Sequence, residues 1–228
     1  TPYAHQAVVN WPVFTENTNG YDVNYRTAAY FNGVNEQFAS SSAPTGWTRY
    51  NSLLSDVMSG TALTSTTYGW SFGTGNGVFD NHAKINIYGT SCKYWLVTPA
   101  INVAAGFVLN FDLALTAYTG NSVPAPALTG TDDKFVVLIS TDDMATWTRL
   151  RQWDNAESEY VYNEIANSAT GEAVSISLDS YVGQSVRIAF YGESTTSNAD
   201  NNLHLDNVIC GLAVPAGAWQ TEHVAAGT

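Results

Sequence analysis

A single carboxylate stands in the middle of an apolar stretch near the C-terminal end of the sequence. Residues 203–210 read LHLDNVIC, and their alternation predicts a half-buried strand. One predicted face carries Leu203, Leu205 and Ile209, and the other carries His204, Val208 and Cys210. Because an unpaired carboxylate in a sheet interior is driven toward its neutral form, we expect a cation, a metal ion or several hydrogen-bond donors beside Asp206.

Acidic residues, a serine motif and histidines are the combinations that could indicate catalysis. Glu157 and Glu159 have the i, i+2 spacing that would place two carboxylates on one side of a strand, as a jelly-roll glycosidase requires. They lie in a polar segment without an ExDxxE-type pattern, and the sequence contains no GxSxG. The four histidines are scattered, and His204, on the strand of Asp206, is expected to be a satisfied core histidine rather than a metal ligand. We therefore predict a non-catalytic protein, with a glycosidase as the less favoured alternative.

Aromatic side chains on loops offer a second kind of site, because a ring face can stack on the apolar face of a pyranose. The candidates on or near predicted loops are Tyr118, Trp153, Tyr160 and Tyr162. The alternative is that these rings cover the edges of the fold.

Two cysteines occur in the chain, Cys92 and Cys210, and they are not spaced as a CxxC pair. Both flank predicted strands, and an exported protein would be oxidised, so we predict a disulfide between them. Two buried thiols are the alternative.

The composition limits the partners of the chain. With 20 acidic and 8 basic residues among 228, the formal net charge is −12, which repels nucleic acid and anionic lipid alike. No apolar run approaches 18 residues, so membrane insertion is not expected. A low charged fraction of 12%, with many Asn, Thr and Tyr residues, is typical of exported bacterial surface proteins. We expect a secreted or cell-surface protein, attached to an outer membrane.

The elements that must position these residues are strands. About ten alternating segments separated by turns, with almost no helical period, predict an all-β sandwich. A short helix is plausible only within residues 153–169. Residues 1–30 predict an N-terminal hairpin or extension, residues 31–212 one domain, and residues 213–228 a linker or docking tail. Residues 140–147 (STDDMATW) resemble an Asp-box hairpin, in which Asp142 would bond backbone amides and Trp147 would pack beneath the turn.

Four short stretches in one order resemble the bacterial cleaved-adhesin or choice-of-anchor J family. They are residues 36–47 with EQF and PTGW, residues 94–101 (YWLVTPAI), residues 135–147 around STD, and residues 205–208 (LDNV). The resemblance covers residues 31–210 and implies a MAM-like, galactose-binding-like jelly roll of two antiparallel sheets. It implies an adhesion module that binds a glycan or a host surface protein. A structural spacer or filament-forming subunit, in contact with neighbouring domains or copies of itself, is the alternative.

The same resemblance implies a structural calcium ion. In that family a Glu of the first strand and an Asp of the last strand share the ion, and the matching positions are Glu36 and Asp206. A hard dication removes the repulsion between two such carboxylates, and backbone oxygens complete its shell. We expect the Val34 carbonyl and a group near Asn86 to contribute, and Asn207 if a bulge turns it inward. A salt bridge from Arg187 to Asp206 is the rival explanation.

Overall fold

The computed structural model describes residues 21–73, 77–119, 132–154, 170–197 and 200–224. The chain divides into two compact units, each described here by itself. The larger unit is Phe31–Ala213, and the smaller one joins Thr1–Tyr30 with Val214–Thr228.

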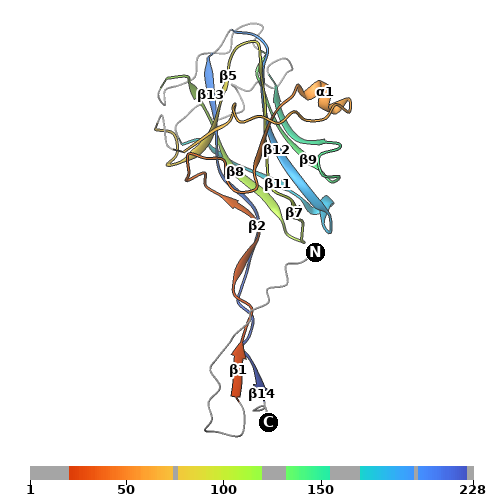
Figure 1. Ribbon diagram of the computed structural model, residues 1–228. Helices are drawn as coiled ribbons and strands as arrows, with labels where there is room; N and C mark the ends of the chain where they lie inside the picture. Colours follow the sequence, from red (N-terminus) through yellow and green to blue (C-terminus); the bar gives the residue numbers. More distant parts are fainter. Residues whose placement is uncertain (1–20, 74–76, 120–131, 155–169, 198–199, 225–228) are drawn as a thin grey trace. The chain divides into compact units, whose positions relative to one another are not determined.

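The larger unit is a β-sandwich of two sheets, and the pairings with a resolved register are antiparallel (Figure 1). The first, here called the β13 sheet, has the order β11 (Glu172–Ser177), β8 (Val108–Ala117), β13 (Asn201–Val214), β5 (His82–Ile87) and β4 (Ser71–Gly73), with β2 (Tyr30–Glu36) against β13. The second, the β12 sheet, has the order β10 (Thr148–Asp154), β9 (Lys134–Ser140), β12 (Ser185–Ser194), β6 (Cys92–Val97) and β3 (Thr48–Asn51), with β7 (Ile101–Asn102) against β12. The predicted all-β sandwich is confirmed.

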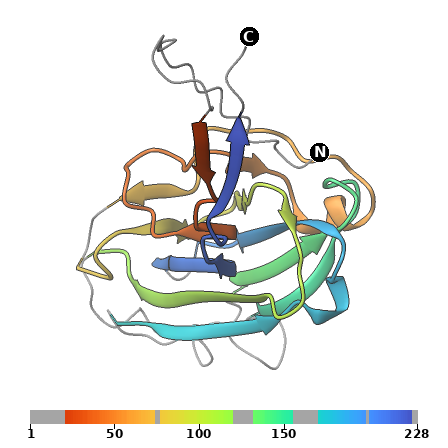
Figure 2. The same ribbon diagram turned by 90° about the horizontal axis from the view of Figure 1, so that it is seen from below.

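The main core lies between the two sheets, which face each other in Figure 2. It is built by alternate residues of the central strands, with Trp47, Phe111 and Phe190 among its large side chains. A second apolar cluster lies on the other face of the β12 sheet, where Leu54 and Val57 of the short helix α1 (Leu54–Met58) cover it. Strand β9 is buried from Phe135 to Ser140 because each of its faces meets one of these clusters. This explains why its sequence is continuously apolar.

A β-bulge interrupts β13 and corrects the predicted faces of that strand. The register with β8 shifts between Asp206 and Ile209, and Asn207 adopts a φ of 48°. The extra residue returns Val208 and Cys210 to the core side, together with Leu203 and Leu205. The prediction that Val208 and Cys210 share a face with His204 is therefore wrong.

The predicted disulfide is also wrong, because Cys92 and Cys210 are free buried thiols. Cys92 is paired with Ser194, at the end of the sandwich where β13 begins with Asn201 opposite Ile87. Cys210 lies nine residues further along β13, which corresponds to roughly 30 Å of extended chain. A disulfide requires its two Cα atoms to lie within about 7 Å.

The hairpin that resembles an Asp-box has the predicted structural role. The Asp142 carboxylate accepts hydrogen bonds from the Thr146 amide at 2.9 Å and from the Thr146 hydroxyl at 2.5 Å. These bonds lower the pKa of Asp142 to about 2. Trp147 is buried in the cluster under α1. Met144, at the position where the motif has Gly, adopts a φ of 77°.

The smaller unit contains a two-stranded antiparallel ribbon of β1 (Tyr21–Tyr25) and β14 (Gln220–Val224). The described part of the predicted N-terminal hairpin thus pairs with the segment predicted as a linker or docking tail. Residues 8–14, the other expected arm of the hairpin, lie outside the described residues. Most of the segment 153–169 also lies outside the described residues, and the prediction that a short helix is plausible only there is wrong, because α1 spans Leu54–Met58.

Where the structure is described, no helix is long and apolar enough to cross a membrane.

Gly33 and Gly211 allow β2 and β13 to approach each other closely. A Cβ at Gly33, where φ is 127°, would lie 2.0 Å from the Cys210 carbonyl oxygen, and one at Gly211 would lie 2.1 Å from the Asn32 carbonyl oxygen. Backbone atoms on both sides leave no flexible group to move aside.

We expect Gly33→Ala to lower the free energy of unfolding by at least about 2 kcal/mol, since it combines an unfavourable φ with a backbone clash. Denaturant unfolding of the full chain measures the change. Gly60→Ala is the matched control, because Gly60 has a φ of 97° but nothing within 4 Å of the added Cβ. Equal losses in the two variants would show that the close approach is not what requires Gly33.

Candidate metal centre and ligand groove

Asp206 lies in β13 immediately before the bulge, and only 6% of its surface is exposed. It is paired across the sheet with Asp112 of β8, so the two carboxylates start from Cβ atoms roughly 5 Å apart. Asp80, in the turn before β5, and Glu36, at the end of β2, also act on Asp206 electrostatically. Together these four residues form the acidic cluster.

The acidic cluster leaves Asp206 in an unfavourable environment. The pKa of Asp206 is raised to about 6, mainly by burial and also by the negative charges of Asp112, Asp80 and Glu36, while a hydrogen bond from the Asn207 amide acts in the opposite direction. The Asp206 Oδ1 atom is buried and has no hydrogen-bond partner among the described residues. A positive charge beside this carboxylate would favour its ionised form.

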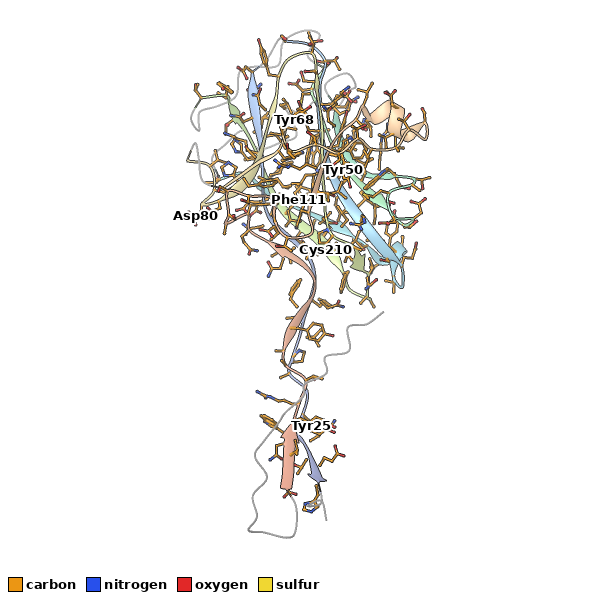
Figure 3. All side chains as sticks on the ribbon, viewed as in Figure 1. Tyr25, Tyr50, Tyr68, Asp80, Phe111 and Cys210 are labelled. Carbon is orange, nitrogen blue, oxygen red and sulfur yellow. The ribbon has the colours of Figure 1, made fainter. Side chains whose placement is uncertain are left out.

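The neighbouring acids are partly held in place by local hydrogen bonds. Glu36 Oε1 accepts a bond of 2.7 Å from the Phe38 amide, and Asp112 Oδ2 accepts one of 2.7 Å from Asn207 Nδ2. Asp80, which Figure 3 labels at the rim of the sandwich, directly follows Phe79, whose φ is 48°. Asp80 and Asp112 were not among the predicted metal ligands. The only signal for Asp112 was its polar character within the apolar strand of residues 108–115.

The structure brings some predicted metal ligands together and separates others. Glu36 and Asp206 both belong to the acidic cluster. Val34 lies two residues before Glu36 with its side chain in the core, and its carbonyl oxygen stays a predicted ligand. Asn86 is opposite Asn202, four residues along β13 from Asp206, which corresponds to roughly 13 Å, so its selection was wrong. Its amide instead bonds Asp200, at 2.9 Å.

The rival explanation for Asp206 is also wrong. Arg187 lies in β12, in the other sheet, where its guanidinium forms an ion pair of 2.6 Å with Asp143 and donates to the Thr98 carbonyl. Asp206 therefore does not depend on Arg187 for its ionisation.

The acidic cluster has the hard oxygen ligands that calcium prefers, and the unpartnered Asp206 oxygen fits such an ion. The described side chains, as they stand, include no three His, Cys, Asp or Glu groups arranged to hold a metal. Glu36 or Asp80 would therefore have to turn toward Asp206 when an ion binds. Backbone oxygens would complete the shell.

His204 lies two residues before Asp206 and is completely buried. Its Nε2 lies 2.9 Å from the Thr116 hydroxyl, and its ring packs edge-on against His82 at 4.7 Å between centroids. Burial is the main reason that the pKa of His204 falls to about 3 and that of His82 to about 4, with Lys84 acting in the same direction. Both imidazoles are neutral at pH 7. His204 is a core histidine as predicted, but it is satisfied only at Nε2, since its buried Nδ1 has no hydrogen-bond partner among the described residues.

A groove of about 540 Å³ lies elsewhere on the sandwich. Its wall combines serine and threonine hydroxyls, one guanidinium and aromatic rings, contributed by Ser41, Ser42, Ala43, Arg49, Thr67, Tyr68, Gly69, Trp70, Ser71 and Phe72. The Arg49 guanidinium donates to the Trp70 carbonyl at 2.7 Å and lies 5.5 Å from the centre of the Phe72 ring. These contacts hold Arg49, the one cationic side chain among the described residues that line the groove, in a fixed position.

Tyr68 is the exposed ring of this groove, with 58% of its surface accessible (Figure 3). Its hydroxyl accepts a bond of 3.3 Å from Asn51 Nδ2, and its ring meets Tyr94 edge-on at 5.7 Å between centroids. Gly69 makes this arrangement possible, because a Cβ there would lie 2.4 Å from the Tyr94 ring. Tyr68 is thus a supported aromatic surface. Tyr68 was not among the predicted ligand-binding residues, since it lies in a segment rich in Ser, Thr and Gly without a recognisable motif.

The aromatic residues predicted to bind a ligand have different outcomes. Trp153 is opposite Phe135 in the β10–β9 register and packs against it in the core at 5.5 Å, with 1% of its surface exposed, so it cannot be a platform. Tyr118 is 55% exposed at the end of β8, as predicted, and its role stays a prediction. Tyr160 and Tyr162, like Glu157 and Glu159, lie outside the described residues.

Comparison with known proteins identified similar structures at low identity. No family model matches the chain, and no curated protein matches it. The K1 cleaved adhesin domain of Lys-gingipain from Porphyromonas gingivalis W83 is 16% identical, over 80% of this chain and 97% of that domain, with a TM-score of 0.48. The K3 cleaved adhesin domain of the same protein is 15% identical, over 78% and 98%, with a TM-score of 0.46. A non-crystalline-cellulose-specific carbohydrate-binding module, CBM28, is 12% identical, over 72% and 87%, with a TM-score of 0.42.

The raised pKa of Asp206 makes the free energy of unfolding of the metal-free protein depend on pH. The folded state holds the Asp206 proton up to about pH 6, whereas the ordinary pKa is 3.8. The folded protein therefore binds more protons than the unfolded chain between these values, so this residue's contribution to the free energy of unfolding falls as the pH rises through them.

We expect Asp206→Asn, in the presence of chelator, to remove this fall and to be more stable than the parent at pH 7.5 by about 2–3 kcal/mol. Denaturant unfolding between pH 4 and 7.5 measures the difference. Asp56→Asn, on the exposed side of α1, should keep the parental dependence. Parallel curves for the parent and Asp206→Asn would contradict the environment described for Asp206.

Proposed function

We propose that the protein is a non-catalytic, calcium-stabilised binding module that recognises glycans through the groove around Tyr68. The single observation that carries the recognition function is this supported, exposed ring beside a fixed guanidinium and several hydroxyl groups. The structural likenesses are too distant to assign a ligand, so the proposal depends on the residues of this chain. A secreted or cell-surface location and a host surface glycan fit this function and belong to the proposal.

Calcium would act as a structural ion at the acidic cluster. Asp206 and Glu36 would be its side-chain ligands, supported by Asp80 or Asp112 and by the Val34 carbonyl. Binding would offset the repulsion among these carboxylates and would hold β2 and the centre of β13 together. The ion would supply no chemistry beyond this positive charge.

Calcium binding predicts a simple change in thermal stability. Adding calcium to chelated protein should raise the melting temperature, and at 100 times the dissociation constant the ion would stabilise the folded state by about 2.7 kcal/mol. Asp206→Asn should abolish the response and Glu36→Gln should weaken it, whereas Asp56→Asn should respond like the parent. If neither calcium nor chelator changed the melting temperature, the ion site would be refuted, but the proposed role of the groove would not be affected.

Several properties of the groove favour a neutral oligosaccharide. The face of Tyr68 can stack on the apolar face of a pyranose, while Arg49 and the hydroxyls of Ser41, Ser42 and Ser71 can bond its hydroxyl groups. The net charge of −12 works against an acidic polymer, since one cation in the groove does little against it. Among the described residues that line the groove there is no pair of carboxylates of the kind that glycoside hydrolysis requires.

Glycan binding can be tested with an array of neutral oligosaccharides, followed by calorimetry on the best one. We expect Tyr68→Ala to weaken binding by about tenfold or more, which corresponds to roughly 1.4 kcal/mol for the lost stacking surface. Tyr88→Ala is the control, because Tyr88 is also exposed, at 43%, but does not line the groove. Loss of binding in Tyr118→Ala with none in Tyr68→Ala would instead place the glycan at the predicted Tyr118 surface. An array without any bound glycan would refute the function.

A further inference from the structure

The ribbon of β1 and β14 is stabilised by paired side chains on one of its faces. Asp22 lies 2.8 Å from His223, and the Thr221 hydroxyl donates to Asn24 at 2.6 Å. These pairs are directly opposite in the register. Since successive side chains alternate between the faces of a strand, Val23 and Tyr25 lie on the other face, opposite Glu222 and Gln220.

The described residues cover that second face incompletely, and they leave the outer edges of the ribbon without a neighbouring strand. Val23 is half-buried, and Tyr25 is 47% exposed (Figure 3). Among the described residues, β1 has one hydrogen-bonded neighbour, and so does β14. A two-stranded ribbon is marginally stable in water, and an open strand edge is a template for another strand. The ribbon is therefore a candidate for strand addition.

The side chains of β1 match a second copy of β1. In an antiparallel pairing about a two-fold axis that uses all five residues, Val23 is opposite Val23 of the other copy, and Asp22 is opposite Asn24. No like charges meet, two β-branched side chains pack across the axis, and a carboxylate faces an amide donor.

The corresponding pairing of β14 is less favourable. An arrangement that uses all five residues would place Glu222 opposite Glu222 of the other copy, and directly opposed like charges destabilise a sheet. The ribbon also avoids the general repulsion between chains of charge −12, since its described charges, Asp22 and Glu222 against Arg26 with His223 titratable, nearly balance. The pattern of charges therefore favours a second copy of this chain as the partner, and β1 rather than β14 as the strand that pairs with it.

We propose that two copies of this chain associate through the edges of their β1 strands that lie away from β14 and form a four-stranded antiparallel sheet in the order β14–β1–β1–β14. The pairing is two-fold symmetric, so it closes at the dimer. It removes the open edge of β1 from each ribbon and covers Val23 with its counterpart. The proposal does not depend on calcium or on a glycan.

A single cysteine at the axis tests the register in the full-length chain. We expect Val23→Cys to form a covalent dimer under mild oxidation, seen on a non-reducing gel, because the two sulfur atoms start from directly opposed positions. Glu222→Cys is the matched control, as it lies on the same face of the ribbon but about 14 Å from its counterpart, three strand spacings away. The native thiols of Cys92 and Cys210 are buried and should not contribute.

A charge at the axis gives an independent measurement by sedimentation. Val23→Lys should raise the dimer dissociation constant at least tenfold while the melting of the sandwich, which belongs to the other compact unit, stays unchanged. Three results would each overturn the proposal. These are a monomeric parent protein, cross-linking of Glu222→Cys in preference to Val23→Cys, and cross-linking of Val23→Cys only after removal of residues 1–20, which would mean that the chain's own N-terminal segment occupies the edge.

Discussion

A β-bulge at Asn207 reconciles two requirements that a regular strand could not meet together. Leu203 and Leu205 must point into the core before it, and Val208 and Cys210 must do so after it, although the spacing from 205 to 208 is odd. One extra residue with a φ of 48° absorbs the difference. The regular register before the bulge pairs Asp206 with Asp112, and Asn207 in the bulge donates its side-chain amide to Asp112, so the bulge residue serves both the core and the acidic cluster.

The ionisable side chains of this sandwich meet different electrostatic environments. His82 and His204 are neutral at physiological pH, so they lose little by being buried against each other. Asp206 has no such option without taking up a proton, because its neighbours are also acidic. Asp142 represents the opposite case, since an exposed carboxylate with three hydrogen bonds from its own hairpin is held ionised. The difference lies in the number of donors that each carboxylate meets, since Asp206 Oδ1 has no hydrogen-bond partner among the described residues.

The two faces of the β12 sheet contact different apolar clusters, which explains where α1 and the Asp-box hairpin lie. Its inner face closes the main core, whereas its outer face is covered by α1 and by Trp147 of the Asp-box hairpin. Tyr191, a member of the outer cluster, connects α1 to the β12 sheet, since its hydroxyl accepts a hydrogen bond from the Leu54 amide and donates one to Glu193. The groove around Tyr68 takes Arg49 from β3, an edge strand of the β12 sheet, and Phe72 from β4, an edge strand of the β13 sheet, so edges of both sheets support its wall.

The amino-acid sequence by itself determined the strands, the sandwich and the local hairpin around Asp142, because alternation and turn chemistry act between residues that are close in the chain. It also singled out Asp206, since a charge in an apolar strand is unfavourable in any fold. The tertiary structure alone decided that Trp153 faces the core, that Asn86 lies far from Asp206, that Cys92 and Cys210 lie at different levels of the sandwich, and that β1 pairs with β14. A period of two says that side chains alternate but not which face is inward, and one bulge reverses the answer. The register between strands separated by a hundred residues is set by the packing of the whole core.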